Sequence, residues 1–554
     1  MRHGGQILVD HLKAQGVRRV FSVPGESFLA ALDGLHESGI ENIVCRHEGG
    51  AAMMAEAHFK ITGEVGIAFV TRGPGASNAA SGIHVAQQDS SPMILFVGQI
   101  DSGHRDRGAF QEVDYRQMFG GLAKWAAEID DISRLPEYLA RAFHLAQSGR
   151  PGPIVLSLPE NMLSARTEIP DLAPPPPMPA TPSEAEIAAL WDGLKDARRP
   201  LVVVGGPHWS TQAARDLADF ASATGLPVAQ TFRRQDRLDA DHPGHAGDLG
   251  VGMNPKLAQR LREADTLLIL GARLGDTATD GYTLIDPAAP GKRVLHVHPD
   301  PDEVGRVWRP DCAIARRAPE IIATLAASVP QGLPDWSDWT AAAHADLLDW
   351  RQSRETPGAV KLEQVMAWLS DNVPADAIAT NGAGNYCTWM HRYFRPRAFP
   401  GQIGPTSGSM GYGFPASIAA SLEHPDKTVL CFAGDGCFQM TLNELSTARQ
   451  YGATPIVILA NNGRYGTIRM HQERTYPGRV SGTDLFNPDY AALARAYGGH
   501  GETVSRTEDF PQAFARAKAA GTVAVIELVL DPQALTPGQT LDAARKQGEN
   551  AVSG

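Results

Sequence analysis

Cysteine is scarce in this chain, and the few cysteines form no familiar binding pattern. The 554 residues include five, at Cys45, Cys312, Cys387, Cys431 and Cys437. Their number is odd, their spacing is wide and no Cys-x-x-Cys pair occurs, which argues against a disulfide framework or a zinc site. We therefore expect a protein of a reducing compartment and predict a cytoplasmic location.

Long apolar runs and an excess of positive charge are also missing. No apolar stretch approaches the roughly 20 residues that span a bilayer, and residues 1–16 lack the apolar core of a signal peptide. Lys and Arg number 50 against 62 Asp and Glu, so the net charge is −12. This balance argues against nucleic acid or an anionic membrane as a partner. We expect a soluble protein that acts on small molecules.

Two segments divide the chain into blocks of domain size. The proline-rich run 171–179 cannot continue a helix or a central strand, so we expect an extended linker there. A second boundary lies at 329–338, where prolines and polar residues gather. A length of 554 residues, at roughly 150 per domain, suggests three to four domains. We predict three domains, at 1–170, 185–330 and 355–540.

Short β-branched runs separated by amphipathic stretches recur in every block. Clear examples are 65–70, 93–97, 201–204, 267–270, 428–433 and 455–460. Such alternation is typical of buried parallel strands joined by helices. We predict the α/β class, with three doubly wound parallel-sheet domains whose ligands bind at the C-terminal ends of the strands.

The most informative segment lies in the third block. A strand at 428–433 ends in Gly434-Asp435-Gly436, and a helix is expected at about 441–451. A second strand, at 455–460, ends in Asn461-Asn462-Gly463. Parallel strands of one βαβ unit end at the same edge of the sheet, so Asp435 and Asn462 can meet one ligand.

The residue types of this segment suit a metal-bound diphosphate. Carboxylate and carboxamide oxygens are donors that Mg²⁺ prefers, and glycines let the backbone approach a phosphate closely. A plain strand–turn–helix with a turn Asp and an Asn-Gly turn is the alternative. Gly-Asp-Gly followed by Asn-Asn at this distance matches the signature of thiamine diphosphate enzymes.

Segments of the first and third blocks extend this resemblance over nearly the whole chain. They are 46–55, 68–78 and 89–93 in the first block and 407–416 in the third. Together they resemble the pyruvate oxidase and acetohydroxyacid synthase group, with an acetolactate synthase-like large subunit as the best match. The resemblance implies pyrimidine-binding, central and diphosphate-binding domains, in that order.

The resemblance also implies roles for individual residues. Glu48 would bond N1′ of the cofactor's aminopyrimidine and promote loss of the proton from C2 of the thiazolium. Met410 would wedge the cofactor into a bent shape, and the carbonyl of Gly408 would accept from the 4′-amino group. Asp435, Asn462 and the carbonyl of Arg464 would hold Mg²⁺. The remaining cofactor contacts would come from Gly384, Asn385, Tyr386, Gly434, Gly436, Cys437, Tyr465 and Gly466. Asn385-Tyr386 replaces the Gln-His pair usual in synthases.

In this group Glu48 and the cofactor belong to different chains. The resemblance therefore implies a homodimer or homotetramer with active sites at the dimer interface. A competing hypothesis, from a different functional class, is a binding or regulatory protein that kept the fold and lost turnover. The intact Glu48 argues against it, because a pure binder has no need of that side chain.

Several features favour the synthase branch, and three depart from it. Phe110 and Gln111 lie in a loop that, in synthases, faces the reacting carbon, and Gly25 belongs to the same substrate region. Thr277 replaces an Arg that grips the acceptor's carboxylate, and His471 replaces a Trp that selects the acceptor. Glu26 puts an acid where synthases carry a small residue; it is either an active-site acid/base or a surface turn residue. His471 is either a pocket residue or an ordinary surface or core histidine.

We therefore expect a thiamine diphosphate- and Mg²⁺-dependent carboligase that decarboxylates a 2-keto acid and passes the acyl unit to a second carbonyl compound. The alternative is a 2-keto acid decarboxylase or C–C lyase of the same family. The central domain lacks the Arg and the Met-His-Gly stretch with which synthases hold FAD, so FAD is possible but not expected. The sequence leaves the donor, the acceptor, any regulatory subunit and the role of the tail after Ala534 open.

Overall fold

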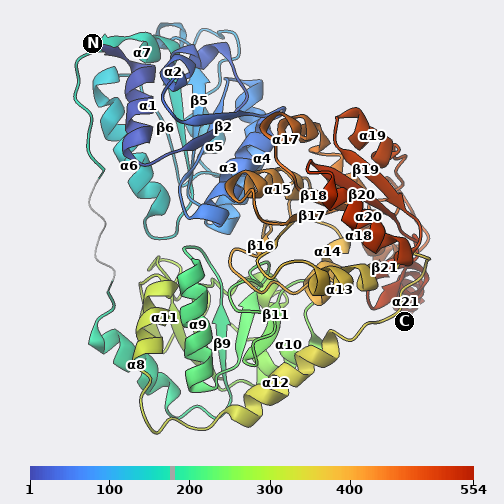
Figure 1. The fold of residues 1–554 in the computed structure, drawn as a ribbon. Coiled ribbons are helices and arrows are strands. Elements are labelled where there is room, and N and C mark those ends of the chain that lie inside the picture. Colours follow the sequence, from blue (N-terminus) through green and yellow to red (C-terminus); the bar gives the residue numbers. More distant parts are fainter. Residues whose placement is uncertain (175–180, 554) are drawn as a thin grey trace. The chain divides into compact units, whose positions relative to one another are not determined.

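The computed structural model describes residues 1–174 and 181–553, so most of the predicted proline-rich linker lies outside the described residues. Three six-stranded sheets, all parallel, dominate this part of the chain, and each occupies its own stretch of sequence (Figure 1). The predicted class and the three doubly wound domains are confirmed. The exact domain boundaries stay predictions.

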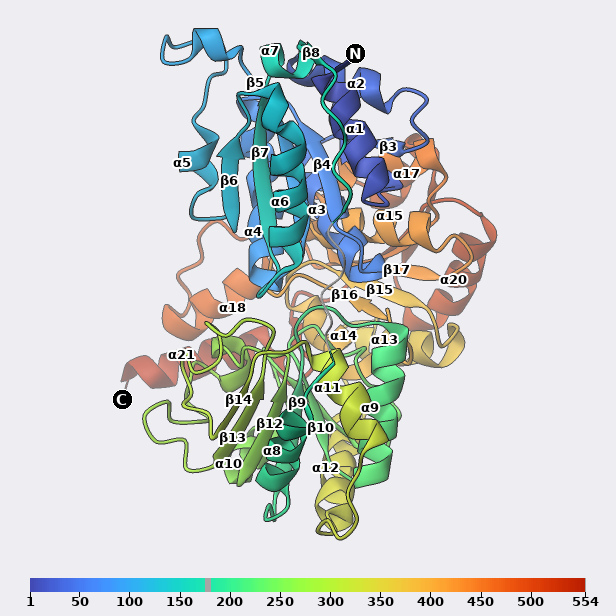
Figure 2. The ribbon, with the colours of Figure 1, turned by 90° about the vertical axis from the view of Figure 1, so that its left-hand side faces the viewer.

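The first sheet has β3 (Glu41–Val44), β2 (Arg19–Ser22), β4 (Gly66–Val70), β5 (Met93–Gln99), β7 (Pro153–Pro159) and β6 (Trp125–Glu128), in spatial order. One face carries α1 (Gly4–Ala14) and α6 (Leu135–Gln147), and the other carries α3 (Glu48–Thr62) and α4 (Pro74–Asp89) (Figure 2). Shorter helices connect the strands: α2 (Leu29–Leu35), α5 (Tyr115–Phe119) and α7 (Glu160–Ser164). A small antiparallel pair joins β1 (Arg2–His3) to β8 (Arg166–Thr167). The inner strands β4 and β5 are buried along their whole length, which explains why they read as nearly continuous apolar runs.

The central sheet has β11 (His245–Leu249), β10 (Val228–Thr231), β9 (Pro200–Val204), β12 (Thr266–Leu270), β13 (Arg293–Val297) and β14 (Cys312–Ile314). Helices α8 (Glu184–Leu194), α9 (Thr211–Thr224) and α11 (Ala318–Ala327) cover one face. Helices α10 (Pro255–Glu263) and α12 (Ser337–Trp350) cover the other (Figure 1). The second predicted boundary falls between α11 and α12, where Trp336 is buried and its indole N–H donates to the carbonyl of Ala197.

The third sheet has β16 (Gln402–Ile403), β15 (Ile378–Asn381), β17 (Val429–Gly434), β18 (Ile456–Asn461), β20 (Ala524–Val529) and β19 (His500–Val504). The helices of this stretch of sequence are α13 (Leu362–Asn372), α14 (Tyr386–Tyr393), α15 (Gly413–Glu423), α16 (Asp435–Phe438), α17 (Leu445–Tyr451), α18 (Gly466–Thr475), α19 (Tyr490–Ala496) and α20 (Phe510–Ala519). The expected helix at 441–451 is shorter than predicted, because a 3₁₀ turn occupies Leu442–Glu444 and α17 begins at Leu445. The strand β17 ends at Gly434, as predicted to within a residue, and the short helix α16, which the sequence analysis did not expect, begins at Asp435. The hydroxyl of Tyr490 donates to the carbonyl of Asp435 there, a tertiary contact that local sequence does not reveal.

The described residues form two compact units that do not follow the three sheets. The first unit takes in the described residues of Met1–Pro179 together with Pro405–His424 and Thr441–Ala453; the second takes in the rest. Helices α15 and α17, from the third predicted domain, therefore pack with the first sheet, α15 against α3 and α17 against β3. Among the described residues, no helix is long and apolar enough to cross a membrane.

The chain's tail is docked rather than free. After the hairpin of β21 (Ala534–Thr536) and β22 (Gln539–Thr540), helix α21 (Leu541–Ser553) packs on α18. Met470 of α18, Leu535, Leu541 and Ala544 form a small apolar cluster between them. The tail therefore packs within the second unit, and its role in function stays open.

Candidate active site

The second unit brings Asp435 against the loop that follows β18. Asp435 is 3% exposed, and its Oδ1 accepts from the backbone N–H of Gly436 at 2.9 Å. Its Oδ2 accepts from the N–H of Gly463 at 2.9 Å, so two motifs far apart in sequence meet at the ends of adjacent strands. Burial raises the pKa of this carboxyl, while hydrogen bonds from Asn487 and the backbone oppose the rise.

Asn487 is a site residue that the sequence analysis did not single out. Its Nδ2 donates to Oδ2 of Asp435 at 2.7 Å and to Oδ1 of Asn461 at 2.8 Å. Its own Oδ1 accepts from Nε2 of Gln439 at 2.8 Å. Asn487 therefore fixes the rotamer of Asp435 from the side. The segment Asn487-Pro488-Asp489 fits the synthase resemblance, but nothing in the local sequence shows that Asn487 contacts Asp435; Asp489 caps α19 two residues later.

Asn462 and Arg464 lie on the same loop. Oδ1 of Asn462 accepts from the N–H of Arg464 at 3.3 Å, and the carbonyl of Arg464 accepts from the N–H of Gly466 at 2.9 Å. A carbonyl oxygen has two lone pairs, so that bond leaves room for a cation. Within the described residues, no group of three or more His, Cys, Asp or Glu is placed to hold a metal. One carboxylate, one amide and one carbonyl, completed by phosphate oxygens and water, nonetheless suit Mg²⁺.

The glycines of this region are closely packed. A Cβ on Gly436 would lie 2.5 Å from the ring of Tyr465, and one on Gly434 would lie 3.1 Å from the ring of Tyr386. Neighbouring rings therefore leave no room for a side chain at Gly434 or Gly436. A strand end without side chains, next to a buried carboxylate, fits a diphosphate and its cation.

Asn385 and Tyr386, which stand in place of the Gln-His pair usual in synthases, have partners within the chain. The hydroxyl of Tyr386 accepts from the N–H of Gly382 at 3.1 Å and lies 3.5 Å from Sγ of Cys437. Burial raises the pKa of Tyr386, so this hydroxyl stays neutral. Oδ1 of Asn385 accepts from the hydroxyl of Thr467, on α18, at 2.8 Å. Gly384, between this pair and β15, has φ +152 and packs on the Tyr386 ring.

The first unit holds the predicted pyrimidine-side residues. Glu48 is the first residue of α3, and its Oε2 accepts from Nδ2 of Asn78 at 2.9 Å. Its other oxygen lies close to Gly75, where an added Cβ would be 3.2 Å away. Gly408 has φ +68, a conformation that favours glycine, and Met410 is half-buried two residues later. Both belong to a loop, residues 405–412, that packs with the first sheet.

The predicted substrate residues of the first unit gather at the C-terminal ends of its strands. A Cβ on Gly25 would lie 2.4 Å from Cβ of Thr71, and a Cβ on Gly73 would lie 2.9 Å from Cβ of Gln111. Gly25, Gln111 and Glu48 therefore surround one loop, residues 71–75. Phe110 is 74% exposed at its edge.

Glu26 lies at this same edge and is held by a buried cation. Its Oε1 accepts from Nη2 of Arg72 at 2.8 Å, and Arg72 also pairs with Glu160. Arg72 is 7% exposed, whereas most of the Glu26 side chain faces solvent. The ion pair holds the Glu26 carboxylate in one place. A turn residue on the surface would not need such a partner.

His471 and Thr277 both belong to the second unit. His471 is exposed on α18. The hydroxyl of Thr277 donates to Oδ1 of Asp276 at 3.3 Å, at the start of a 3₁₀ turn. The roles of His471, Glu26 and Phe110 stay predictions.

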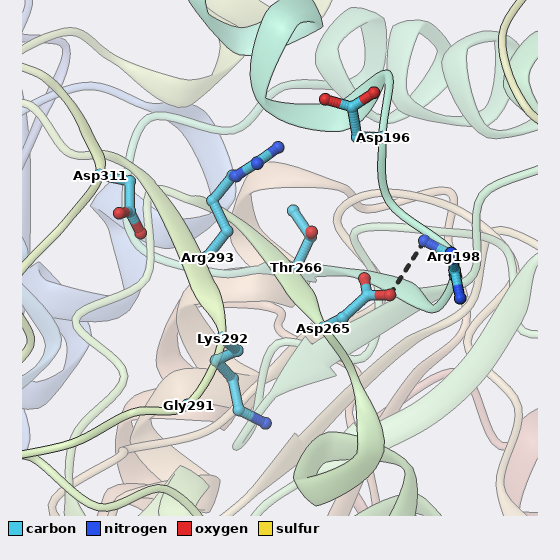
Figure 3. Close-up of a pocket in the computed structure, with 8 residues that line it drawn as sticks. All are labelled: Asp196, Arg198, Asp265, Thr266, Gly291, Lys292, Arg293 and Asp311. Atoms are coloured by element: carbon cyan, nitrogen blue, oxygen red, sulfur yellow. Dashed lines mark hydrogen bonds between the residues drawn. The ribbon is translucent and has the colours of Figure 1, made fainter.

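A separate hollow opens in the central sheet, at the N-terminal ends of strands β12 and β13 (Figure 3). It has a volume of about 460 Å³ and is lined by Asp196, Arg198, Asp265, Thr266, Gly291, Lys292, Arg293 and Asp311. Oδ2 of Asp265 accepts from the N–H of Arg198 at 2.9 Å, and burial lowers the pKa of Lys292 to about 8. The hollow lies where β12 and β13 begin, so none of the predicted site residues lines it.

Fold and site together define a class. Parallel-sheet domains that carry a Gly-Asp-Gly strand end, packed against an Asn-Asn-Gly loop, are built to hold a diphosphate-bearing cofactor. Comparison with known families gives three successive matches. They are the thiamine pyrophosphate enzyme N-terminal TPP binding domain at residues 2–118, the central domain at 187–325 and the C-terminal TPP binding domain at 382–528.

The most similar curated proteins agree. The acetolactate synthase isozyme 2 large subunit of Escherichia coli K12 is 32% identical over 91% of both chains. The acetolactate synthase large subunit of Parasynechococcus marenigrum is 32% identical over 95% of this chain and 87% of its own. The acetolactate synthase of Mycobacterium bovis is 31% identical over 94% and 87%. The chain belongs to the thiamine pyrophosphate enzyme family, in its acetolactate synthase-like branch, and is an enzyme that depends on thiamine diphosphate.

Proposed function

We propose that this enzyme is a Mg²⁺-dependent carboligase, which decarboxylates pyruvate or a related 2-keto acid and transfers the acyl unit to a second carbonyl compound. The observation that carries the proposal is the position of Asp435, held by Asn487 against the loop of Asn462 and Gly463 at the edge of a parallel sheet. The likeness to acetolactate synthases over more than nine-tenths of the chain supports the reaction type.

The metal and the diphosphate would be held by the second unit. Asp435, Asn462 and the carbonyl of Arg464 would bind Mg²⁺. The diphosphate would contact Gly384, Asn385, Gly434, Gly436, Cys437, Tyr465 and Gly466, and Tyr386 would support these glycines from beneath. When bound, thiamine diphosphate supplies the electron sink that lets a 2-keto acid lose CO₂.

The first unit would supply proton handling and shape. Glu48 would hold a proton at N1′ of the pyrimidine ring, the carbonyl of Gly408 would accept from the 4′-amino group, and Met410 would keep the cofactor bent. Holding these groups in place favours proton transfer because no encounter step is needed. Gly25, Phe110, Gln111 and His471 would bound the substrate space.

We further propose a homodimer or homotetramer, in which Glu48 serves a cofactor bound to the partner chain. A cytoplasmic location is proposed because the five cysteines are free in the structure, as suits a reducing compartment. We propose that FAD is not required; purified protein without visible flavin absorbance and with full activity would support this.

A second candidate, a 2-keto acid decarboxylase or C–C lyase, is favoured by one specific observation. Glu26 is fixed by Arg72 at the edge that also carries Glu48 and Gln111. An acid held there could protonate the acyl unit before a second carbonyl arrives. Thr277 points the same way, because it offers no positive charge to an acceptor's carboxylate.

Product analysis separates the two candidates. Purified enzyme is incubated with thiamine diphosphate, Mg²⁺ and pyruvate, without added FAD, and every carbon product is identified by chromatography. Acetolactate would support the carboligase, and acetaldehyde alone would support the decarboxylase. Untouched pyruvate, in an enzyme that still exchanges the C2 proton of its cofactor, would move the search to bulkier or uncharged substrates.

A further inference from the structure

The loop at 405–412, which carries Gly408 and Met410, is tied at both ends to the helices of the first sheet. The ties form one group of buried and half-buried polar side chains, Glu56, Lys60, Asp89, Thr406 and Tyr412, which we name the loop-anchoring cluster. All five belong to the first unit. None of them takes part in the function proposed above.

Each end of the loop has its own carboxylate. At the first end, the N–H of Thr406 donates to Oδ1 of Asp89 at 2.8 Å, and the Thr406 hydroxyl donates to the same oxygen. At the other end, the hydroxyl of Tyr412 donates to Oε2 of Glu56. Lys60 lies between them, 2.9 Å from Oε1 of Glu56 and paired with Oδ2 of Asp89.

Burial makes these contacts hard to give up. The side chains of Glu56 and Asp89 are 0% exposed, and that of Lys60 is 8% exposed. Two carboxylates share one ammonium, so each needs further hydrogen-bond donors to offset the loss of contact with water. Ser91 supplies one to Oε1 of Glu56 at 2.6 Å, and Tyr412 and Thr406 supply the rest. Moving either end of the loop would leave a buried carboxylate short of a donor.

The cluster is also rigidly connected to Glu48. Glu48 and Glu56 lie on one helix, α3, and eight residues correspond to a rise of about 12 Å. Helix α15, which begins directly after Tyr412, packs along α3. The positions of Gly408 and Met410 are thus defined relative to α3 and its first residue.

We propose that Tyr412 and Thr406 are positioning residues. They hold Gly408 and Met410 in the position, relative to α3 and Glu48, that cofactor activation requires. This inference rests on the proposed function, because it assigns the loop its catalytic purpose. Neither side chain carries a charge, so changing either one removes a single hydrogen-bond donor and leaves Glu56 and Asp89 still paired with Lys60. They are therefore better probes than Glu56, Lys60 or Asp89, whose variants are at risk of not folding.

The first experiment measures the anchor without any cofactor. Amide hydrogen exchange of the full-length apo protein is followed by mass spectrometry for the peptide that spans 405–412. Tyr412→Phe and Thr406→Val should exchange faster there than the wild type, and Thr406→Ser should restore protection. Tyr138→Phe and Ser417→Ala are matched controls and should not change it. Tyr138, on α6, stacks on Trp125 of β6. The hydroxyl of Ser417 donates to the carbonyl of Phe414, within α15.

The second experiment asks whether the anchor matters for activation. At saturating thiamine diphosphate and Mg²⁺, each variant should lower kcat and the C2 proton exchange rate by about tenfold or more, because small misplacements of reacting groups are costly. KM for the keto acid should change little. A purely structural role would lower the melting temperature but leave kcat per folded enzyme unchanged.

Two results would overturn the proposal: unchanged amide exchange in both variants, or faster amide exchange with unchanged C2 proton exchange. Failure of the proposed function looks different. In that case the wild type would form no ligation product from pyruvate, or would show no C2 proton exchange, whereas the variants would still loosen the loop in the apo protein.

Discussion

At the scale of single residues, Glu48 offers the sharpest test of the activation chemistry. Its carboxylate contacts only Asn78 and the backbone around Gly75 among the contacts described above. Glu48→Gln keeps the shape but cannot hold the proton, so we expect C2 proton exchange and kcat to fall by about 10²–10⁴-fold. Cofactor affinity, measured by quenching of intrinsic fluorescence, should change little. The exposed Glu37→Gln is the control, and full turnover of Glu48→Gln would refute the assignment.

Asp435 tests the metal site in the same way. Asp435→Ala removes the carboxylate that Gly436, Gly463 and Asn487 orient, so Mg²⁺ should no longer increase retention of thiamine diphosphate. The measurement is cofactor retained after gel filtration, with and without Mg²⁺. Asp484→Asn, an exposed carboxylate nearby, should behave like the wild type. Metal-dependent retention that survives in Asp435→Ala would disprove the ligand assignment.

At the scale of elements, the docking of α21 on α18 depends on one buried carboxylate. Glu473, with 0% side-chain exposure, accepts from Nε of Arg545 at 2.9 Å and from Nη2 at 2.8 Å. Arg469 and the N–H of Gly478 also donate to it. The Arg545 guanidinium, first among these donors, lowers the pKa of Glu473 from 4.5 to about 2.

This shift predicts a pH dependence of stability. A carboxyl whose pKa is lower in the folded state stabilises it above the unfolded pKa, and the effect is lost as pH falls toward the folded value. Glu473→Gln should therefore lower the melting temperature by a few degrees near neutral pH. The difference from wild type should shrink between about pH 4.5 and 2. Glu508→Gln, from an exposed pair with Arg506, should show almost no difference. A pH-independent difference for Glu473→Gln would contradict the assignment.

At the scale of the whole molecule, the proposed dimer predicts that two inactive variants restore activity when they are combined in one dimer. Glu48→Gln and Asp435→Ala each damage one half of every site. If the two halves come from different chains, mixed dimers of the two inactive variants contain one site with both residues intact. We expect co-expressed variants to recover up to about half of the wild-type activity per mixed dimer, as follows from the isologous arrangement of such interfaces.

Tagged pulldown of the mixed dimer and steady-state assay provide the measurement. Each variant expressed alone is the control. No recovery in a demonstrated mixed dimer would mean that Glu48 and Asp435 act within one chain, and the proposed interface would be wrong.

Local patterns in the sequence indicated the order of most strands and helices and predicted the chemistry of the central motif. Periodic β-branched runs predicted the three parallel sheets, because strands buried on both faces must be apolar throughout. Asp435 and Asn462 were singled out from their spacing and residue types at two strand ends, because a strand end is a local feature with a local signature, and their role as metal ligands stays a prediction. Glu48, Gly408 and Met410 came from resemblance, and their roles remain to be tested.

Only the tertiary structure decided which distant groups support these residues. Asn487 orients Asp435 from 52 positions away, Arg72 fixes Glu26, and Tyr412 with Thr406 ties a loop of the third domain to helices of the first. In each of these contacts, neither segment's local sequence indicates its partner. A hydrogen bond between distant side chains depends on how whole elements pack. The same reason explains why α15 and α17 belong to the first compact unit, a division that local patterns along the chain do not encode.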